Sequence, residues 1–134
     1  MHEVKLNPGF DVDEVALIYE EQGWWHKSKF QKKLLENAIK GSFAYACAYE
    51  GGRVVGIGRV SSDGLSDAYI HDVGVKKECM GKGIGSDIVK ALVAHLESKG
   101  IDWIVLIAKS GTEKFWRKMG FVEMKRFRAM RYAK

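Results

Sequence analysis

The chain has 134 residues, of which 46% are hydrophobic and 29% charged, and its formal net charge is +5. This composition predicts one globular domain over residues 1–134 and excludes disordered, collagen-like and coiled-coil proteins. No apolar run approaches the roughly 18 residues that span a bilayer. The first ten residues do not resemble a signal peptide, and Cys47 and Cys79 have no metal-ligand spacing. We therefore expect a cytoplasmic protein with reduced thiols, no metal and no membrane partner.

The first 40 residues favour an edge strand and two helices. The strand is expected over residues 2–6. Asp11 and Glu14 have the spacing of a capping box and would begin the first helix. Ser28 and Gln31 would cap the second helix in the same way. The apolar side of that second helix is predicted from residues at helical spacing: Phe30, Leu34, Ala38 and Ile39.

The middle of the chain predicts a mixed sheet. Residues 43–49 and 53–61 are β-rich runs joined by a glycine turn, which is typical of an antiparallel hairpin, and residues 68–75 form a third run. An amphipathic helix over residues 83–99 leads to a short apolar run, residues 103–108, of the kind found in central strands. A strand–helix–strand unit pairs its strands in parallel through a right-handed crossover.

The C-terminal part predicts one more helix and the closing strands. Ser110 and Glu113 have capping spacing, and Phe115, Trp116 and Met119 follow on the helix. Residues 121–132 would form one or two closing strands. The exposed edge of such a strand would allow a homodimer to form by pairing of two sheets. The expected fold class is α/β (α+β mixed), with a mixed, mostly antiparallel sheet flanked by about four helices.

Three alternating glycines lie between the third β-rich run and the long helix. Glycine lets the backbone approach a ligand closely, and the first N–H groups of a helix are unpaired donors that suit a phosphate or pyrophosphate. The spacing matches neither a P-loop nor a dinucleotide fingerprint. The alternative is a glycine-rich turn without a ligand. The segment reads Met80-Gly81-Lys82-Gly83-Ile84-Gly85-Ser86, and its lysine adds a positive charge.

Two segments resemble the GCN5-related N-acetyltransferase (GNAT) family. The family's pyrophosphate motif, Arg/Gln-x-x-Gly-x-Gly/Ala, is matched by residues 80–85, and its Phe-Tyr-x-Lys-x-Gly-Phe motif by residues 115–121. The resemblance implies an acetyl-CoA-dependent N-acetyltransferase, in which a primary amine attacks the thioester directly. It also implies a parallel strand pair that splays apart to admit the pantetheine arm of acetyl-CoA.

The same resemblance assigns roles to individual residues. The backbone of Val73, Gly74 and Val75 would bond the pantetheine amides, with the glycine easing a bulge. Residues 81–86 would hold the pyrophosphate, and Phe115 and Trp116 would pack against the cofactor.

This chain departs from the family's pattern at two positions. Met80 replaces an arginine or glutamine and removes a side-chain donor. Trp116 replaces the tyrosine that is credited with protonating the leaving thiolate, and an indole N–H is too weak an acid for that task.

Two residues of the third β-rich run are candidates for the general base, Asp72 and His71. Burial would raise the pKa of a carboxyl group, and the pKa of histidine lies near neutrality. Strand alternation predicts that Asp72 shares a face with Ile70, and that His71 lies on the opposite face with Val73. As alternatives, Asp72 pairs with a basic side chain or caps a backbone group, and His71 is an ordinary strand residue.

The acceptor is open among small-molecule and peptide amines. Trp24 and Trp25 lie where the family often forms its acceptor wall, and core packing is the alternative for at least one of them. A non-catalytic acyl-CoA-binding module is the second reading, because Met80 and Trp116 depart from the motifs. A nucleic-acid surface is the third, disfavoured because basic side chains near the C-terminus typically form a solvated face: Lys125, Arg126, Arg128, Arg131 and Lys134.

Overall fold

The computed structural model describes residues 1–25 and 32–133, so the cap predicted at Ser28 and Gln31 lies outside the described residues, as does Phe30. Within this part of the chain, five strands form one sheet in the order β1-β2-β3-β4-β5. The strands from β1 to β4 pair antiparallel, whereas β4 and β5 pair in parallel. The predicted mixed, mostly antiparallel sheet is therefore confirmed. The strands are β1 Glu3–Leu6, β2 Ala44–Glu50, β3 Arg53–Ser62, β4 Asp67–Val75 and β5 Trp103–Val105.

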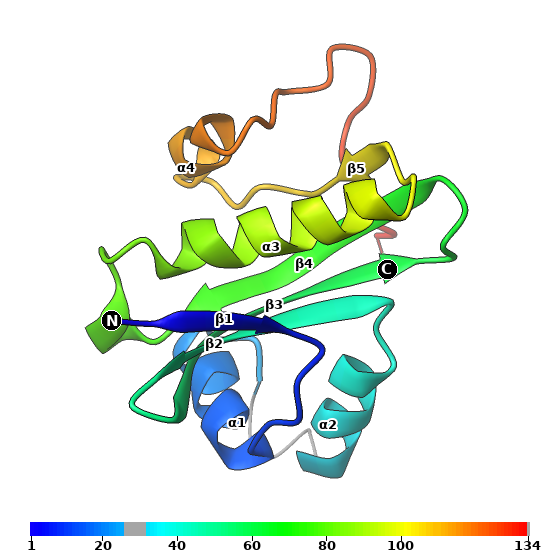
Figure 1. The fold of residues 1–134 in the computed structure, drawn as a ribbon. Helices are drawn as coiled ribbons and strands as arrows, with labels where there is room; N and C mark the ends of the chain where they lie inside the picture. Colours follow the sequence, from blue (N-terminus) through cyan, green and yellow to red (C-terminus); the bar gives the residue numbers. More distant parts are fainter. Residues whose placement is uncertain (26–31, 134) are drawn as a thin grey trace.

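Helices cover both faces of the sheet (Figure 1). On one face lie α1 (Val12–Glu21) and α2 (Lys32–Lys40), and on the other lies α3 (Ile84–Ser98). The short α4 (Glu113–Lys118) follows β5, and a 3₁₀ turn, η1 (Lys77–Cys79), links β4 to the glycine loop. Each face has its own buried core. None of the helices in the described residues is long and apolar enough to cross a membrane.

The N-terminal helices form for reasons that differ in part from the predicted ones. The carboxylate of Asp11 caps α1 by accepting from the Asp13 N–H. Glu14 does not complete a capping box, because its carboxylate accepts from the Val54 N–H of β3 instead. In α2 the buried residues include Leu35, whereas Leu34 is 55% exposed. The predicted apolar side of this helix was therefore wrong at two positions, because Ala38 is exposed as well.

β4 contains a bulge next to the predicted pantetheine segment. Asp72 and Val73 together oppose a single β3 residue, Gly58. The backbone of Asp72 has φ 57°, in the left-handed region that few residues other than glycine adopt. A bulge of this kind inserts one extra residue and re-aims the side chains around it.

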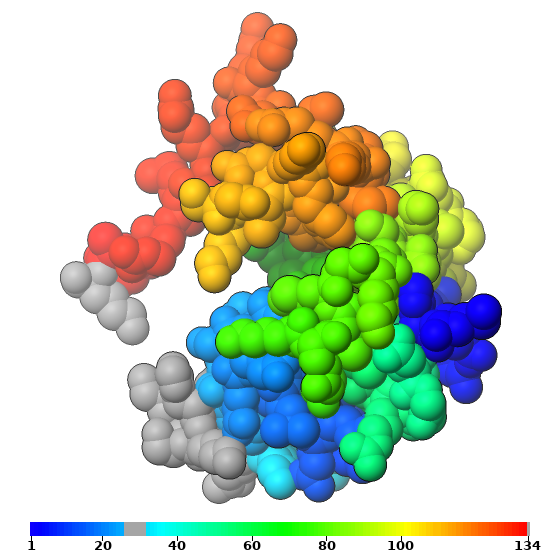
Figure 2. All heavy atoms as spheres, turned by 90° about the vertical axis from the view of Figure 1, so that its left-hand side faces the viewer, coloured from blue at the N-terminus to red at the C-terminus, as the bar shows by residue number. Residues whose placement is uncertain are grey.

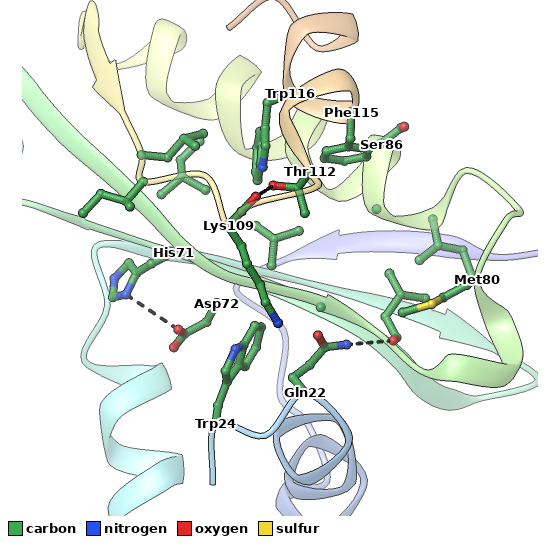
Figure 3. A pocket seen from close by; sticks show the side chains of 18 of the residues that line it. Gln22, Trp24, His71, Asp72, Met80, Ser86, Lys109, Thr112, Phe115 and Trp116 are labelled. Carbon is green, nitrogen blue, oxygen red and sulfur yellow. Dashed lines mark hydrogen bonds and ion pairs between the residues drawn. The ribbon is translucent and has the colours of Figure 1, made fainter. Parts of the chain in front are cut away.

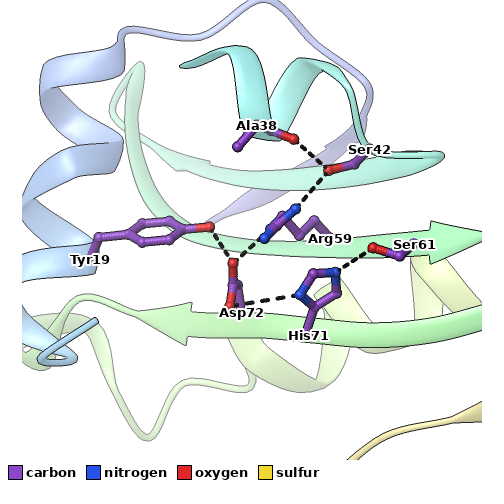
Figure 4. Close-up of polar contacts among 7 residues, drawn as sticks. All are labelled: Tyr19, Ala38, Ser42, Arg59, Ser61, His71 and Asp72. Atoms are coloured by element: carbon purple, nitrogen blue, oxygen red, sulfur yellow. Dashed lines mark hydrogen bonds and ion pairs between the residues drawn. The ribbon is translucent and has the colours of Figure 1, made fainter. Parts of the chain in front are cut away.

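The bulge overturns the predicted alternation of the base candidates. Ile70 and Val73 both pack into the core beneath α3, although they are three positions apart. His71 and Asp72 both lie toward the α1–α2 side, where their side chains approach one another (Figure 4). The prediction that these two side chains point to opposite faces was wrong, because the extra residue shifts the period of the strand.

β4 and β5 separate soon after they pair. Their register covers three residue pairs, from Asp67 with Trp103 to Tyr69 with Val105, while β4 continues to Val75. The chain after β5 therefore leaves the bulged half of β4 paired with β3 on one side and without a strand partner on the other. The run 103–108 was predicted as a central strand, and it is instead a three-residue strand at the edge of the sheet, with Ile107 61% exposed.

The closing strands predicted over residues 121–132 are absent from the described residues. This C-terminal tail is exposed, with Met130 at 91%, and it touches the sheet where the Phe127 ring lies 5.8 Å from that of Trp103. Adjacent charges at Lys125 and Arg126 interrupt the alternation that a half-buried strand needs. These residues therefore do not form the sheet edge expected for a homodimer, and the edge strands of the sheet in the described part of the chain are β1 and β5.

Candidate active site

A cleft of about 690 Å³ opens where β4 and β5 separate. Figure 2 shows it as a hollow between the segment around residues 107–116 and the blue end of α1, with β4 behind. Its lining combines the bulged half of β4, the glycine loop, the start of α3, and the segment that follows β5. The predicted splay of the parallel pair is therefore the origin of the cleft.

Most of the predicted cofactor residues line this one cleft. They are Val73, Gly74, Val75, Met80, Gly81, Gly83, Ile84, Gly85, Ser86, Phe115 and Trp116. Lys82 is the exception, because its ammonium group lies 3.5 Å from both carboxylate oxygens of Glu50 and outside the lining residues. The side chain of Met80 is exposed and offers no hydrogen bond at its position.

The glycine loop has the geometry of an anion site at the start of α3. Gly81 and Gly83 both have φ 81°, and a Cβ atom at either position would meet open space. Gly83 is the N-cap of α3, so the N–H groups of the first turn have no helical partner. Together with the helix dipole, these donors suit a pyrophosphate. The residues present therefore fit the phosphate end of acetyl-CoA.

The aromatic pair of the second motif lines the cleft next to the start of α3. Phe115 and Trp116 meet edge to face at 5.0 Å, and Trp116 meets Phe121 in the same way at 5.4 Å. A Cβ atom on Gly85 would lie 3.6 Å from the ring of Phe115. Glu113 accepts from the Gly111 N–H at the start of α4, so it caps its own helix. The indole of Trp116 therefore packs against Phe115 and Phe121 as part of the cleft wall.

The two tryptophans after α1 have different environments. Trp24 is 36% exposed and lines the cleft, where its ring lies against Gly74 and edge to face with Tyr19. Trp25 is 5% exposed and belongs to the core beneath α1 and α2. Of the predicted acceptor wall, only Trp24 is therefore in place.

Asp72 is held by two side chains that the sequence did not single out (Figure 4). One of its oxygens accepts from the Arg59 Nε–H at 2.6 Å and from the Tyr19 hydroxyl at 2.9 Å. Burial and the neighbouring carboxylate raise the pKa of Tyr19, which keeps the hydroxyl protonated as a donor. Arg59 also bonds Ser42 at the end of α2. Asp72 therefore pairs with a basic side chain, one of the alternatives left open above.

His71 stands beside this pair and lines the cleft. Its Nε2 lies 2.8 Å from the Ser61 hydroxyl, and its Nδ1 lies 4.0 Å from a carboxylate oxygen of Asp72. Burial lowers the pKa of His71, the nearby Arg59 guanidinium lowers it further, and Asp72 opposes the shift. The imidazole is consequently neutral at physiological pH and able to accept a proton.

Sequence reasoning missed four contributors to the site. Tyr19 and Arg59 reach Asp72 from α1 and β3, and Gln22 donates to the Val75 carbonyl inside the cleft. Lys109 enters the cleft from the segment between β5 and α4 (Figure 3). No local motif marks these residues. A charged side chain in the middle of an apolar strand, as at Arg59, was the only signal available.

Comparisons with known proteins show the family to which the chain belongs. The Acetyltransferase (GNAT) family matches residues 12–121, and the chain belongs to this family. Serotonin N-acetyltransferase 2, chloroplastic, from Oryza sativa subsp. japonica is 29% identical over 118 residues, which cover 87% of this chain and 59% of that protein. Histone acetyltransferase TAP1 from Glycine max is 27% identical over 134 residues, covering 90% and 57%. The chain thus spans less than two thirds of these relatives.

Solved structures share the fold. A GNAT-family acetyltransferase from Streptococcus pneumoniae TIGR4 has a TM-score of 0.83 at 24% identity, covering 100% of this chain and 98% of that one. Glucosamine-6-phosphate N-acetyltransferase from Arabidopsis thaliana has a TM-score of 0.73 at 18% identity, covering 98% and 99%. The arrangement of the strands and helices is therefore that of the family's fold.

Proposed function

We propose that this chain is an acetyl-CoA-dependent N-acetyltransferase that moves an acetyl group to a primary amine by direct attack on the thioester. The observation that carries the proposal is that eleven of the twelve predicted cofactor residues line one cleft, together with His71. When bound, acetyl-CoA would supply the activated acetyl group. Val73 to Val75 would hold the pantetheine amides, and the start of α3 would hold the pyrophosphate.

His71 is the proposed general base. In the transfer, the C–N bond forms as the C–S bond breaks, the electron pair of that bond leaves with sulfur, and the amine loses a proton. His71 is neutral and reaches the cleft, so it can take that proton directly or through water. Asp72 is a positioning residue in this scheme, because Arg59 and Tyr19 already occupy one of its oxygens. Family membership supports acetyl-CoA as the donor.

The acceptor class follows less directly from the relatives. Their names include serotonin and histones, which are an arylalkylamine and a source of peptide amines. A cleft wall formed by Trp24 suits an acceptor with an apolar body. We propose a primary amine carried on a small molecule or a peptide.

Calorimetry with acetyl-CoA tests the proposal first. Gly85 lines the cleft, and a Cβ atom there would make ordinary contacts with Phe115 and Val75, so Gly85→Leu would place a bulky side chain at the proposed cofactor site. We expect saturable binding by the wild-type chain, and at least tenfold weaker binding by Gly85→Leu. Gly9→Leu is the matched control, because Gly9 has no neighbour within 4 Å and lies away from the cleft.

Release of free thiol then separates the enzyme from a binding module. Serotonin, a histone-tail peptide and a polyamine are the acceptors to compare. Binding followed by amine-dependent thiol release supports the proposal. Binding without release for any amine would favour the non-catalytic module, and no binding by the wild-type chain would overturn both.

A further inference from the structure

The acid that the family's tyrosine would supply is missing at Trp116. The indole N–H does not donate a proton to a thiolate, and the ring is fixed by edge-to-face contacts with Phe115 and Phe121. Negative charge nevertheless develops on sulfur as the C–S bond breaks. A positive group aimed at that position would stabilise the charge.

Five titratable side chains line the cleft in the described part of the chain: Tyr69, His71, Asp72, Cys79 and Lys109. The first three lie on β4 and Cys79 lies on η1, while the stretches of α1, α3 and α4 that face the cleft add no charged side chain. Asp72 is paired with Arg59. The Cys79 thiol lies 3.9 Å from a Glu50 carboxylate oxygen. Lys109 is the one lysine or arginine of this set, and no ion pair among the described residues neutralises its charge.

The backbone of Lys109 is fixed although its side chain is free. Its carbonyl accepts from both the N–H and the hydroxyl of Thr112, at 3.0 and 2.6 Å. These bonds close a turn at the start of α4. Figure 3 shows the side chain of Lys109 running across the cleft, over β4, toward the side that Gln22 and Trp24 form. It therefore lines the same cleft as the stretch of β4 assigned to the pantetheine arm.

We propose that Lys109 is a catalytic residue that stabilises and protonates the thiolate leaving group, in place of the missing tyrosine. The inference rests on the proposed function. The electron pair of the broken C–S bond remains on sulfur, the Lys109 ammonium donates a proton to it, and the amine so formed regains a proton from solvent. The amine proton of the acceptor goes separately to His71. A lysine next to a thiol favours the thiolate form, by the same interaction that lowers the pKa of reactive cysteines.

The test measures the thiol pKa of bound CoA, which needs no acceptor. Ultraviolet absorbance of the thiolate is followed against pH at saturating CoA. An opposite charge within about 4–6 Å shifts a pKa by 1–3 units, so we expect a bound thiol pKa at least one unit below that of free CoA. Lys109→Met should return it toward the free value, whereas Lys109→Arg should keep it low because the charge remains.

Lys90→Met is the matched control, because this exposed lysine lies on α3 outside the cleft. A lysine that only held the cofactor would change the affinity for CoA and leave the thiol pKa of Lys109→Met equal to that of the wild type, which would overturn the proposal. Normal CoA binding with an unshifted thiol pKa in the wild type would overturn the role of Lys109 alone. Absence of CoA binding would overturn the proposed function as well.

Discussion

At the scale of single residues, the site depends on a histidine that the fold keeps neutral. Burial and the Arg59 guanidinium hold the pKa of His71 below its usual value of about 6.5. The unfolded chain therefore binds a proton at a higher pH than the folded chain. Lowering the pH through about 6.5 should destabilise the fold, since the free energy of unfolding rises with pH, and so falls on acidification, wherever the unfolded state binds more protons.

This linkage is measurable without a known acceptor. Urea unfolding at a series of pH values from 8 down to 5 should show a falling free energy of unfolding in the wild type, and a smaller fall in His71→Gln. His95→Gln is the control, because it removes a histidine that lies against Phe43, outside the cleft. An equal fall in wild type and His71→Gln would contradict the assigned direction of the pKa shift.

At the scale of elements, β3 and α3 lie close together because a glycine of β3 stands at their contact. A Cβ atom on Gly58 would lie 2.8 Å from Ile88 and 3.2 Å from Leu92, both buried on α3. Overpacking of this kind typically costs about 1–3 kcal/mol. We expect Gly58→Ala to lower the free energy of unfolding by that amount in chemical denaturation. Gly9→Ala, whose Cβ would meet open space, should change it by less than about 0.5 kcal/mol.

The elements also mark the limit of what the sequence predicted. Local patterns were sufficient for the hairpin, the long helix and the glycine loop, because turn residues and apolar spacing act within a few positions. The bulge at Asp72 was beyond them, since it depends on the pairing of β4 with β3 and on a backbone conformation that aspartate rarely adopts. The pairing of Arg59 with Asp72 follows from that register. The strands predicted over tail residues 121–132 were wrong, because a strand needs a neighbouring strand to pair with as well as suitable residues.

At the scale of the whole molecule, the C-terminal tail differs from the rest. No strand or helix forms over residues 121–133, and Val122 is 84% exposed. Brief trypsin treatment should therefore cleave after Arg126, Arg128 and Arg131 before it cleaves within the sheet. Mass spectrometry of the products checks this, with the buried β3 segment as the internal reference. Cleavage in β3 as early as in the tail would contradict it.

The bulge has a consequence for how such a gene can change. Substitutions along β4 alter one side chain at a time, and most leave its neighbours in place. Loss of a single codon between His71 and Gly74 would act differently, because it would restore the simple period of two and turn Asp72 or its successor toward the other face. The strand would keep almost the same composition and the same hydrophobic character, yet it would no longer hold the imidazole and the carboxylate together. The number of residues in β4 is therefore as important for the site as the identity of those residues.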